Sequence, residues 1–366
     1  MAVSVRIGES RRIEFSASEL TGAVGDSITV LPIVVALALL TEISLPHVLI
    51  AFGVFQVVWG VWYGLPVSVE PMKALAALAV AGALSYAELA LAGLVLGVVL
   101  LGIGYTGALS VVKRWIGEPV IRGIQFAVGL ILLETALSLA AEDFMLAGVG
   151  LAIALGVVTL GYKNASALVV LGAGAAIAVW TSGVPAVQSP GLPPVPALES
   201  ALTWGVADGI VAQFAMTIGN AALATSLLFS DLFDREVSAD ELSGSMGVTN
   251  LLAVPLGGIP MCHGCDGVAG KYEFGARTGG ANVLLGIGYL TLALVATGTL
   301  VAAFPLAMLG VLLALVALSL GSSVKESSDL PLSMGIGLLA LVWNIGAAFA
   351  LGICAHLLFE RYRRGA

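Results

Sequence analysis

The stretch LPVSVEPMKALAALA, residues 65–79, decides how this chain folds. Val67, Ser68 and Val69 favour extended structure, Pro71 fixes a backbone angle that suits the first turn of a helix, and a run of Ala and Leu follows. The stretch therefore predicts a short strand that leads directly into a helix.

The sequence on both sides of this stretch is too apolar for a water-soluble protein. Of the 366 residues, 59% are hydrophobic and 10% are charged, and the mean hydropathy is +1.06. Apolar runs of about 20 residues, the length that crosses a bilayer, follow one another between residues 20 and 359. They lack the alternation of barrel strands, and every backbone polar group in lipid must be satisfied internally. The predicted fold class is therefore an all-α polytopic membrane protein.

Fourteen spans with both chain ends in the cytoplasm agree best with the positions of the cations. The predicted spans are 20–40, 45–63, 71–85, 87–106, 117–140, 144–161, 165–181, 201–229, 243–258, 262–276, 279–300, 303–320, 331–342 and 343–359. With this topology every Lys and Arg except Lys73 and Lys271 falls on one side, as the positive-inside rule requires of the cytoplasmic face. We expect a multi-pass protein of the cell membrane.

The Pro/Gly-rich stretch 182–200 is the one long interruption, and it divides the spans into two sets of seven. Residues 1–19 are polar and contain no signal peptide. The predicted parts are a cytoplasmic tail, a first seven-span repeat, an extracytoplasmic linker, a second seven-span repeat and a cytoplasmic tail, at residues 1–19, 20–181, 182–200, 201–359 and 360–366.

The two halves resemble each other faintly. TGAVGD (21–26) matches TWGVAD (203–208), Pro71-Met72 matches Pro260-Met261, and Pro119 with Gly123 matches Pro305 with Gly310, at offsets of 182, 189 and 186 residues. An odd number of spans per repeat makes the second copy insert upside down. Inverted repeats are typical of secondary transporters, whose site lies between the halves near the middle of the bilayer.

The counterpart of residues 65–79 is PLGGIPMCHGCDGVAGKYEFGARTGG, residues 255–280, where glycines interrupt the apolar run and Pro260 takes the place of Pro71. Spans three and ten are therefore predicted as half-helices that begin inside the membrane after short strands. Their unpaired amides and positive dipole ends would form a receptor for an anion.

Lys73 and Lys271 are the two cations that no loop explains. An ammonium at membrane depth must pair or line a wet cavity. Lys73 either assists an anion or pairs with Glu70 or Asp266, whereas Lys271 is expected to pair with Glu273 or to reach the inner interface.

Acidic residues inside the spans are the candidates for proton coupling. Glu70 leads, because a carboxylate beside an anion site repels the substrate unless it is protonated or paired; Asp26 and Asp266 are the other candidates. The alternative for Asp26 and Asp208 is that they cap broken helices, which we favour for Asp208.

The cluster Cys262-His263-Gly264-Cys265-Asp266 contains zinc-type ligands at the spacing of half a site only, and His47, His356 and Cys354 lie on other segments. A metal site and a redox CxxC centre are alternatives. The simpler interpretation is a helix break with His263 facing the cavity, without metal or cofactor.

At these segments the chain resembles the molybdate transporter family that is related to the SulP sulfate permeases. VSVEPMKALAALA (67–79) and residues 257–280 are similar to the family's two signature stretches, IGEPVIRGI (116–124) to the start of span five, and TIGNAALATSLLFSDLF (217–233) to span eight. Glutamine is usual in the family where Glu70 stands, and we do not expect the C-terminal STAS domain that the larger SulP members carry.

The resemblance implies core and gate domains built from the two inverted repeats, with an oxyanion bound between spans three and ten and flanked by spans one and eight. The predicted substrate-binding residues are Ser27, Thr29, Met72, Lys73, Ala74, Gln213, Asn220, Cys262, His263 and Gly264.

The predicted function is secondary active transport of a tetrahedral oxyanion, molybdate or sulfate, by alternating access. No GxxxxGK[ST] motif is present, so pumping driven by ATP is not expected. A passive anion channel and a cysteine oxidoreductase are the other two classes, and we do not expect an enzyme. The expected partners are the oxyanion and membrane lipid, without nucleic acid; a co-transported proton and a homodimer are left open.

Overall fold

The computed structural model describes residues 3–6 and 12–365, and it is mostly helical. Seven helical stretches in this part of the chain are long and apolar enough to cross a membrane: α1 (Ala17–Leu40), α2 (Leu45–Tyr63), α4 (Tyr86–Thr106), α6 (Glu118–Ala140), η1 with α8 (Lys163–Ala165, Ser166–Ser182), α9 to α10 (Trp204–Met216, Thr225–Phe233) and α15 with η5 (Leu306–Ser322, Ser323–Glu326). Four shorter apolar helices are α7 (Phe144–Thr159), α13 (Gly280–Ala293), α16 (Leu330–Val342) and α17 (Ile345–Gly365).

Three further helices complete the fourteen predicted spans: α11 (Ala239–Ala253) and the half-helices α3 (Lys73–Val80) and α12 (Cys265–Glu273). The strands β3 (Glu70–Pro71) and β4 (Met261–Cys262) come just before the half-helices, as predicted. The short helices α5 (Leu109–Ile116) and α14 (Gly298–Ala302) were not predicted as separate elements. α14 begins inside the predicted span 279–300, because α13 ends at Ala293.

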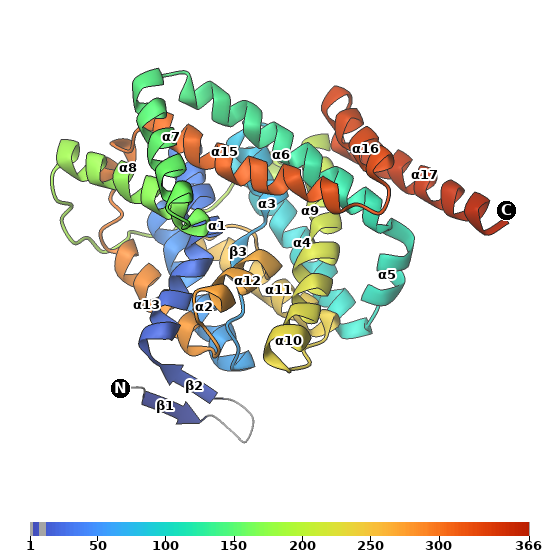
Figure 1. The fold of residues 1–366 in the computed structure, drawn as a ribbon, viewed down its shortest axis with the longest axis horizontal. Helices are drawn as coiled ribbons and strands as arrows, with labels where there is room; N and C mark the ends of the chain where they lie inside the picture. Colours follow the sequence, from blue (N-terminus) through green and yellow to red (C-terminus); the bar gives the residue numbers. More distant parts are fainter. Residues whose placement is uncertain (1–2, 7–11, 366) are drawn as a thin grey trace.

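The helices form two groups (Figure 1). The core domain contains α1 to α4 and α9 to α13, where α2 packs on α13 and α4 on α11. The gate domain contains α6 to α8 and α15 to α17, where α6 packs on α15 and α16. In the repeat, α1, α2, α3 and α4 correspond to α9, α11, α12 and α13. The pair α2/α13 therefore corresponds to α11/α4, and the pair α1/α12 corresponds to α9/α3. All four pairs are in contact. The packing therefore repeats between the halves, in agreement with the predicted fold class.

Small residues bring the core helices close together, as is usual where no water drives helix association in lipid. A Cβ on Gly104 of α4 would lie 2.5 Å from the backbone nitrogen of Gly244 of α11. A Cβ on Gly53 of α2 would lie 2.8 Å from the carbonyl oxygen of Gly286 of α13. These contacts fix the frame that holds the two half-helices.

The N-terminal stretch is folded rather than a plain polar tail. β1 (Val3–Arg6) pairs antiparallel with β2 (Arg12–Phe15), and residues 1–2 and 7–11 of the predicted tail lie outside the described residues. Buried Glu19, in the first turn of α1, accepts hydrogen bonds from the amides of Arg277, Thr278 and Ala281 at the start of α13. α1 thus begins at Ala17 and is tied to α13.

The stretch after span seven crosses the core without regular structure until the turn Leu198–Ser200 (η2). It is held where the Gln188 amide donates to the Leu294 carbonyl and the Gly191 carbonyl contacts His47 Nε2. At the other end, α17 continues through most of residues 360–366, and Ala366 lies outside the described residues. Asp208 Oδ1 accepts from the amide of Gly346 in the first turn of α17, so Asp208 caps a broken helix as predicted.

Candidate functional site

The two half-helices begin at a shared point because their strands pair. Glu70 lies opposite Cys262 and Pro71 opposite Met261 in an antiparallel pair, and the amide of Met72 donates to the Pro260 carbonyl at 2.8 Å. The first turns of α3 and α12 therefore lie side by side. This is the arrangement that the two Pro-Met sequences predicted.

Each helix start already binds a side-chain oxygen. The amide of Ala74, in the first turn of α3, donates to Gln213 Oε1 of α9 at 2.9 Å. The amide of Gly267, in the first turn of α12, donates to Glu70 Oε1 at 2.9 Å. Amides at a helix start attract negative charge, so Glu70 occupies a position suited to an anion.

Lys73 lies between two carboxylates. Its Nζ is 2.8 Å from Glu70 Oε2 and 2.9 Å from Asp266 Oδ2, so the pairing alternative is what the structure shows. Apart from this ion pair, Glu70 Oε2 makes no hydrogen bond among the described residues. The Lys73 and Glu70 side chains are 6% and 0% exposed, whereas that of Asp266 is 49% exposed. Asp266 is therefore the member of this cluster that solvent can reach.

Lys271 corrects the sequence prediction. Its fully buried Nζ is 3.0 Å from Asp26 Oδ2 and donates to three more oxygens, of Gln56, Val67 and Asn282. It neither pairs with Glu273 nor reaches the interface. The reason is the rotation of α12, which packs closely on α1 and turns Lys271 toward the interior of the core.

Ser68 joins the two ion pairs. Its hydroxyl lies 2.5 Å from Asp26 Oδ1 and 3.0 Å from Glu70 Oε1. A continuous row of charges therefore runs from Lys271 through Asp26, Glu70 and Lys73 to Asp266. Three carboxylates against two ammonium groups leave one negative charge in excess when all five are ionised.

Gly267 is packed against this row. A Cβ there would lie 2.2 Å from Asp26 Oδ1 and from Ser68 Oγ, and 2.4 Å from Glu70 Oε1. We expect Gly267→Ala to lower the free energy of unfolding by about 1–3 kcal/mol, the usual cost of overpacking. Melting temperatures in detergent would measure the loss. Gly288→Ala is the matched control, because a Cβ at Gly288 of α13 meets nothing within 4 Å; equal melting temperatures for the two variants would contradict the expectation.

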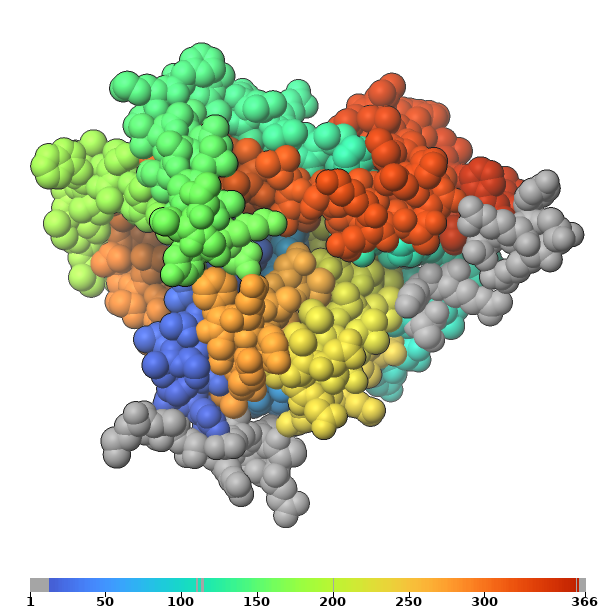
Figure 2. Space-filling model, in the orientation of Figure 1, coloured from blue at the N-terminus to red at the C-terminus, as the bar shows by residue number. Residues whose placement is uncertain are grey.

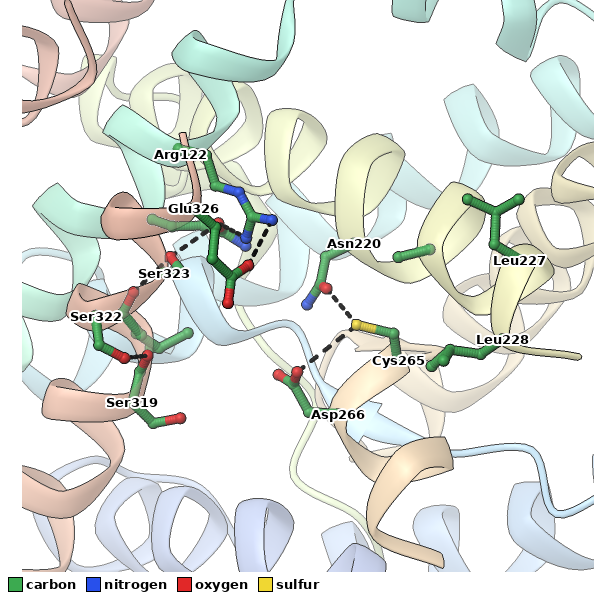
Figure 3. Close-up of a pocket in the computed structure, with 13 residues that line it drawn as sticks. Arg122, Asn220, Leu227, Leu228, Cys265, Asp266, Ser319, Ser322, Ser323 and Glu326 are labelled. Atoms are coloured by element: carbon green, nitrogen blue, oxygen red, sulfur yellow. Dashed lines mark hydrogen bonds and ion pairs between the residues drawn. The ribbon is translucent and has the colours of Figure 1, made fainter. Parts of the chain in front are cut away.

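A cavity of about 470 Å³ lies between the core and the gate, beside Asp266. Figure 2 shows the seam where α15 of the gate meets α10 and α12 of the core. The gate contributes polar side chains, and the core contributes Asn220, Cys265, Asp266 and apolar residues of α10; Figure 3 shows Asn220 and Asp266 on either side of the Cys265 thiol. The cavity is lined by Arg122, Gln125, Asn220, Ala224, Leu227, Leu228, Cys265, Asp266, Ser319, Leu320, Ser322, Ser323 and Glu326.

Two further cavities adjoin it. One of about 220 Å³ shares Asp266, Ser319 and Leu320 with the first and is also lined by Thr29 and Lys73. Another of about 440 Å³ shares Arg122, Gln125 and Asn220 with the first. The space between the domains thus reaches from the start of α6 to the Lys73 ammonium group.

The structure brings only part of the predicted set to these cavities. Four predicted residues line them, namely Thr29, Lys73, Asn220 and Asp266. The others are buried in the packing around the helix starts: Ser27, which bonds Tyr289, and Asp26, Glu70, Met72, Ala74, Gln213 and Cys262. Gly264 is the N-cap of α12, against the Glu70 carboxylate.

His263 does not face the cavity, which corrects the prediction. Its ring contacts Trp59 and Tyr63 edge-on, Nδ1 lies 2.8 Å from the Ser68 carbonyl, and Nε2 lies 2.8 Å from Ser245 Oγ. The residue is 1% exposed. β4 ends at Cys262, and the chain then turns the imidazole between α2 and α11, where both ring nitrogens are satisfied.

The cysteines have separate partners. Cys262 Sγ contacts the Pro71 carbonyl, and Cys265 Sγ contacts Asn220 Oδ1 and Asp266 Oδ1. In the part of the chain that the structure describes, no three His, Cys, Asp or Glu side chains are grouped so that they could hold a metal ion.

Sequence reasoning did not assign the gate side of the cavity. The predicted site residues include none of Arg122, Gln125, Ser319, Ser323 and Glu326, which form this wall. A signal was present, because Arg122 with Gln125, and Ser319 with Ser323 and Glu326, lie at helical spacing at the ends of two otherwise apolar spans. Asn220 belongs to a π-helical segment, Thr217–Ala224 (η3), and π turns often occur at functional sites.

Comparison with known families supports the resemblance seen in the sequence. The family described as "Molybdate transporter of MFS superfamily" matches residues 18–132 and 205–320. Residue 205 lies 187 residues after 18, and 320 lies 188 after 132, close to the offsets between the repeats. Molybdate transporter 2 of Arabidopsis thaliana is 30% identical over 94% of this chain and 86% of its own length. Molybdate transporter 1 of the same plant is 29% identical over 84% of this chain and 80% of its own length.

Solved structures share the fold at low identity. The transmembrane domain of the bicarbonate transporter BicA of a cyanobacterium matches with a TM-score of 0.66 and 17% identity, over 93% of this chain and 96% of that one. SLC26A9 matches with a TM-score of 0.73 and 15% identity, over 94% of this chain and 65% of that one. With the family match over more than half of its length, the chain belongs to the molybdate transporter family and is an anion transporter rather than an enzyme.

Proposed function

We propose that the chain is a secondary transporter that carries a tetrahedral oxyanion, molybdate first and sulfate second, by alternating access. The observation that carries the proposal is the continuous space between core and gate that ends at Lys73 and Asp266, beside the starts of α3 and α12. Helix starts and an ammonium group together favour a dianion. The curated relatives are named as molybdate transporters, which puts molybdate before other oxyanions.

The anion binds where Asp266 now holds Lys73. Asp266 is the exposed carboxylate of the pair, and its side chain faces both adjoining cavities. An oxyanion that takes its place accepts from the Lys73 ammonium and lies near the Asn220 side chain. Thr29 completes the far wall.

A proton offsets the charge of the substrate. The ionised cluster already carries one excess negative charge, and a dianion would raise the excess to three. Of the three coupling candidates, Asp26 is held by Lys271, Gln56 and Ser68, and Glu70 lies buried behind Lys73. Asp266 takes the proton, because it is exposed to the cavity and protonation loosens its hold on Lys73.

The conformation is open toward the face that carries the cationic loops. The cavities are lined by residues at the start of α6 and the end of α15, and by Lys163 after α7. The positive-inside rule places these loops in the cytoplasm of a cell-membrane protein, with both termini on the same side. Beyond Lys73, the paired strands and their neighbours Val69, Met72 and Met261 are buried, so a closed layer separates the cavity from the other face. Such a layer favours a carrier over an open channel.

Uptake of labelled molybdate into proteoliposomes tests the proposal. We expect saturable uptake that increases when the outside is acidified, with competition by tungstate and sulfate but not by uracil. Phosphate, which carries protons at neutral pH, should compete less. Absence of saturable molybdate uptake would contradict the proposal, as would conductance far above about 10³ ions per second, the upper range of ordinary turnover.

A further inference from the structure

Arg122 binds two carboxylates at the outer end of the main cavity. Its Nε lies 3.1 Å from Glu118 Oε1, and its Nη2 lies 2.8 Å from Glu326 Oε2. Its Nη1 donates to Gln125 Oε1 at 3.3 Å. Figure 3 shows the Arg122 guanidinium group next to Glu326, with the core residue Asn220 opposite them. A planar guanidinium fork is the side chain best suited to oxyanions.

Arg122 lines the cavities that lead to Lys73. Arg122 lines both the 470 Å³ and the 440 Å³ cavities, together with Gln125 and Asn220. The first of these continues past Asp266 into the cavity that contains Lys73. An anion that enters through the 470 Å³ cavity therefore meets the guanidinium group before it meets the ammonium group.

The two carboxylates on Arg122 are not held equally. Glu118 Oε2 also accepts from the amide and hydroxyl of Ser328, at 3.0 and 2.7 Å. The Glu326 side chain is 69% exposed and lies at the end of the short turn η5, and Arg122 is its only partner in the described part of the chain. Glu326 is thus the carboxylate that a competing anion can replace.

This cationic position exists in one half of the chain only. At the repeat offset of 186 or 187 residues, Arg122 corresponds to Met308 or Leu309, and Gln125 to Val311 or Leu312. These counterparts are buried and apolar. The opposite side of the gate therefore offers no matching anion position.

We propose that Arg122 is a second oxyanion position at the mouth of the cavity, where an arriving tetrahedral dianion replaces Glu326 before it moves to Lys73. The proposal rests on the transport function proposed above. Arg122 together with Glu118 and Glu326 carries one excess negative charge, whereas Arg122 with Glu118 alone is neutral. Glu326 therefore keeps the affinity of this position moderate, so that an anion arrives and leaves.

Equilibrium binding of labelled molybdate to the purified protein in detergent tests the proposal, because it does not depend on orientation in a vesicle. We expect a second, weaker molybdate site besides the one at Lys73, and Arg122→Gln should weaken this second site about tenfold, the effect of losing one charge-assisted pair. The affinity of Arg122→Lys for molybdate should lie between those of the unmodified protein and Arg122→Gln, because lysine keeps the positive charge and loses the planar guanidinium fork. Glu326→Gln should tighten binding severalfold. Lys325→Gln, which removes an exposed charge next door, should change it less than twofold.

Whether each variant binds molybdate more tightly or more weakly decides between the possible outcomes. If Arg122→Gln fails to fold, tighter binding by Glu326→Gln still supports the proposal, and unchanged or weaker binding overturns it. Equal affinities of Arg122→Gln and Lys325→Gln overturn it as well. Failure of the unmodified protein to bind molybdate, sulfate or tungstate would instead overturn the proposed function itself.

Discussion

Replacing Lys271 by methionine should lower the free energy of unfolding by about 3–5 kcal/mol, the cost of breaking a buried ion pair by removing one partner. Lys271 and Asp26 are both 0% exposed, and the ammonium group also satisfies oxygens of Gln56, Val67 and Asn282. Methionine fills a similar volume but removes one donor from each of these oxygens and leaves the Asp26 carboxylate without its counter-charge. Gln56 Oε1 and the Val67 carbonyl keep the Asn282 side-chain amide as a donor. Thermal unfolding in detergent, followed by size-exclusion fluorescence, would measure the loss.

A second substitution separates the lost charge from lost packing. Asp26→Asn together with Lys271→Met removes both charges, and we expect it to recover part of the stability lost by Lys271→Met alone. Lys325→Met, at an exposed position, serves as the control. A melting temperature for Lys271→Met that equals that of the control would show that the buried pair does not hold the half-helix in place.

Lys73→Gln should lower molybdate transport by at least about a hundredfold. Removing the ammonium group leaves the Glu70 and Asp266 carboxylates beside the incoming dianion without a counter-charge. At a separation of about 4 Å and an effective dielectric constant of about 20, one charge is worth about 4 kcal/mol. We therefore expect kcat/KM for molybdate to fall by at least about a hundredfold, since each 1.4 kcal/mol is a factor of ten.

A double variant tests whether Lys73 acts through its charge. Lys73→Gln with Asp266→Asn restores the original charge balance, so it should regain part of the molybdate binding that the single variant loses. Its transport should lose pH dependence if Asp266 is the coupling group. A double variant that binds no better than Lys73→Gln would show that Lys73 acts through the structure rather than through charge.

The membrane topology and the broken helices could be predicted because local sequence decides them. Length and hydropathy set the spans, and proline with glycine ends or begins a helix wherever it occurs. Pro71 and Pro260 therefore indicated the two half-helices, and the repeat indicated that they meet. The hairpin β1/β2 was not predicted, because its pairing depends on contacts with the distant start of α13.

The candidate site was predicted only in part, because side-chain direction depends on how each short helix is rotated. Lys271 and Asp266 are five residues apart on the same half-helix, yet one points into the core and the other into the cavity. His263 has the residue type of a site and the environment of a core residue, bonded at both nitrogens. No local pattern distinguishes these cases.

The gate side of the cavity illustrates a different limit. Gln125 and Ser323 are 198 residues apart in sequence and bond each other in the fold. Arg122 and Glu326 meet in the same way. Each residue alone looks like an ordinary polar group at the end of a span, and only the packing of α6 on α15 brings them to one wall.

The charge row from Lys271 to Asp266 combines two roles. Its inner pair is sealed and fixes the position of α12, whereas its outer group faces the cavity and is free to exchange partners. Ser68 connects the two parts. This arrangement keeps a rigid support close to a replaceable ion pair, which suits the proposed transport by alternating access.

The position of bound tungstate tests the central claim most directly. Tungstate has the shape and charge of molybdate, and its anomalous scattering marks its position in a crystal without ambiguity. The account predicts a tungsten peak in the space between core and gate, beside the starts of α3 and α12 and in contact with Lys73. A fully occupied tungsten site elsewhere, with the Lys73–Asp266 pair unchanged, would contradict it.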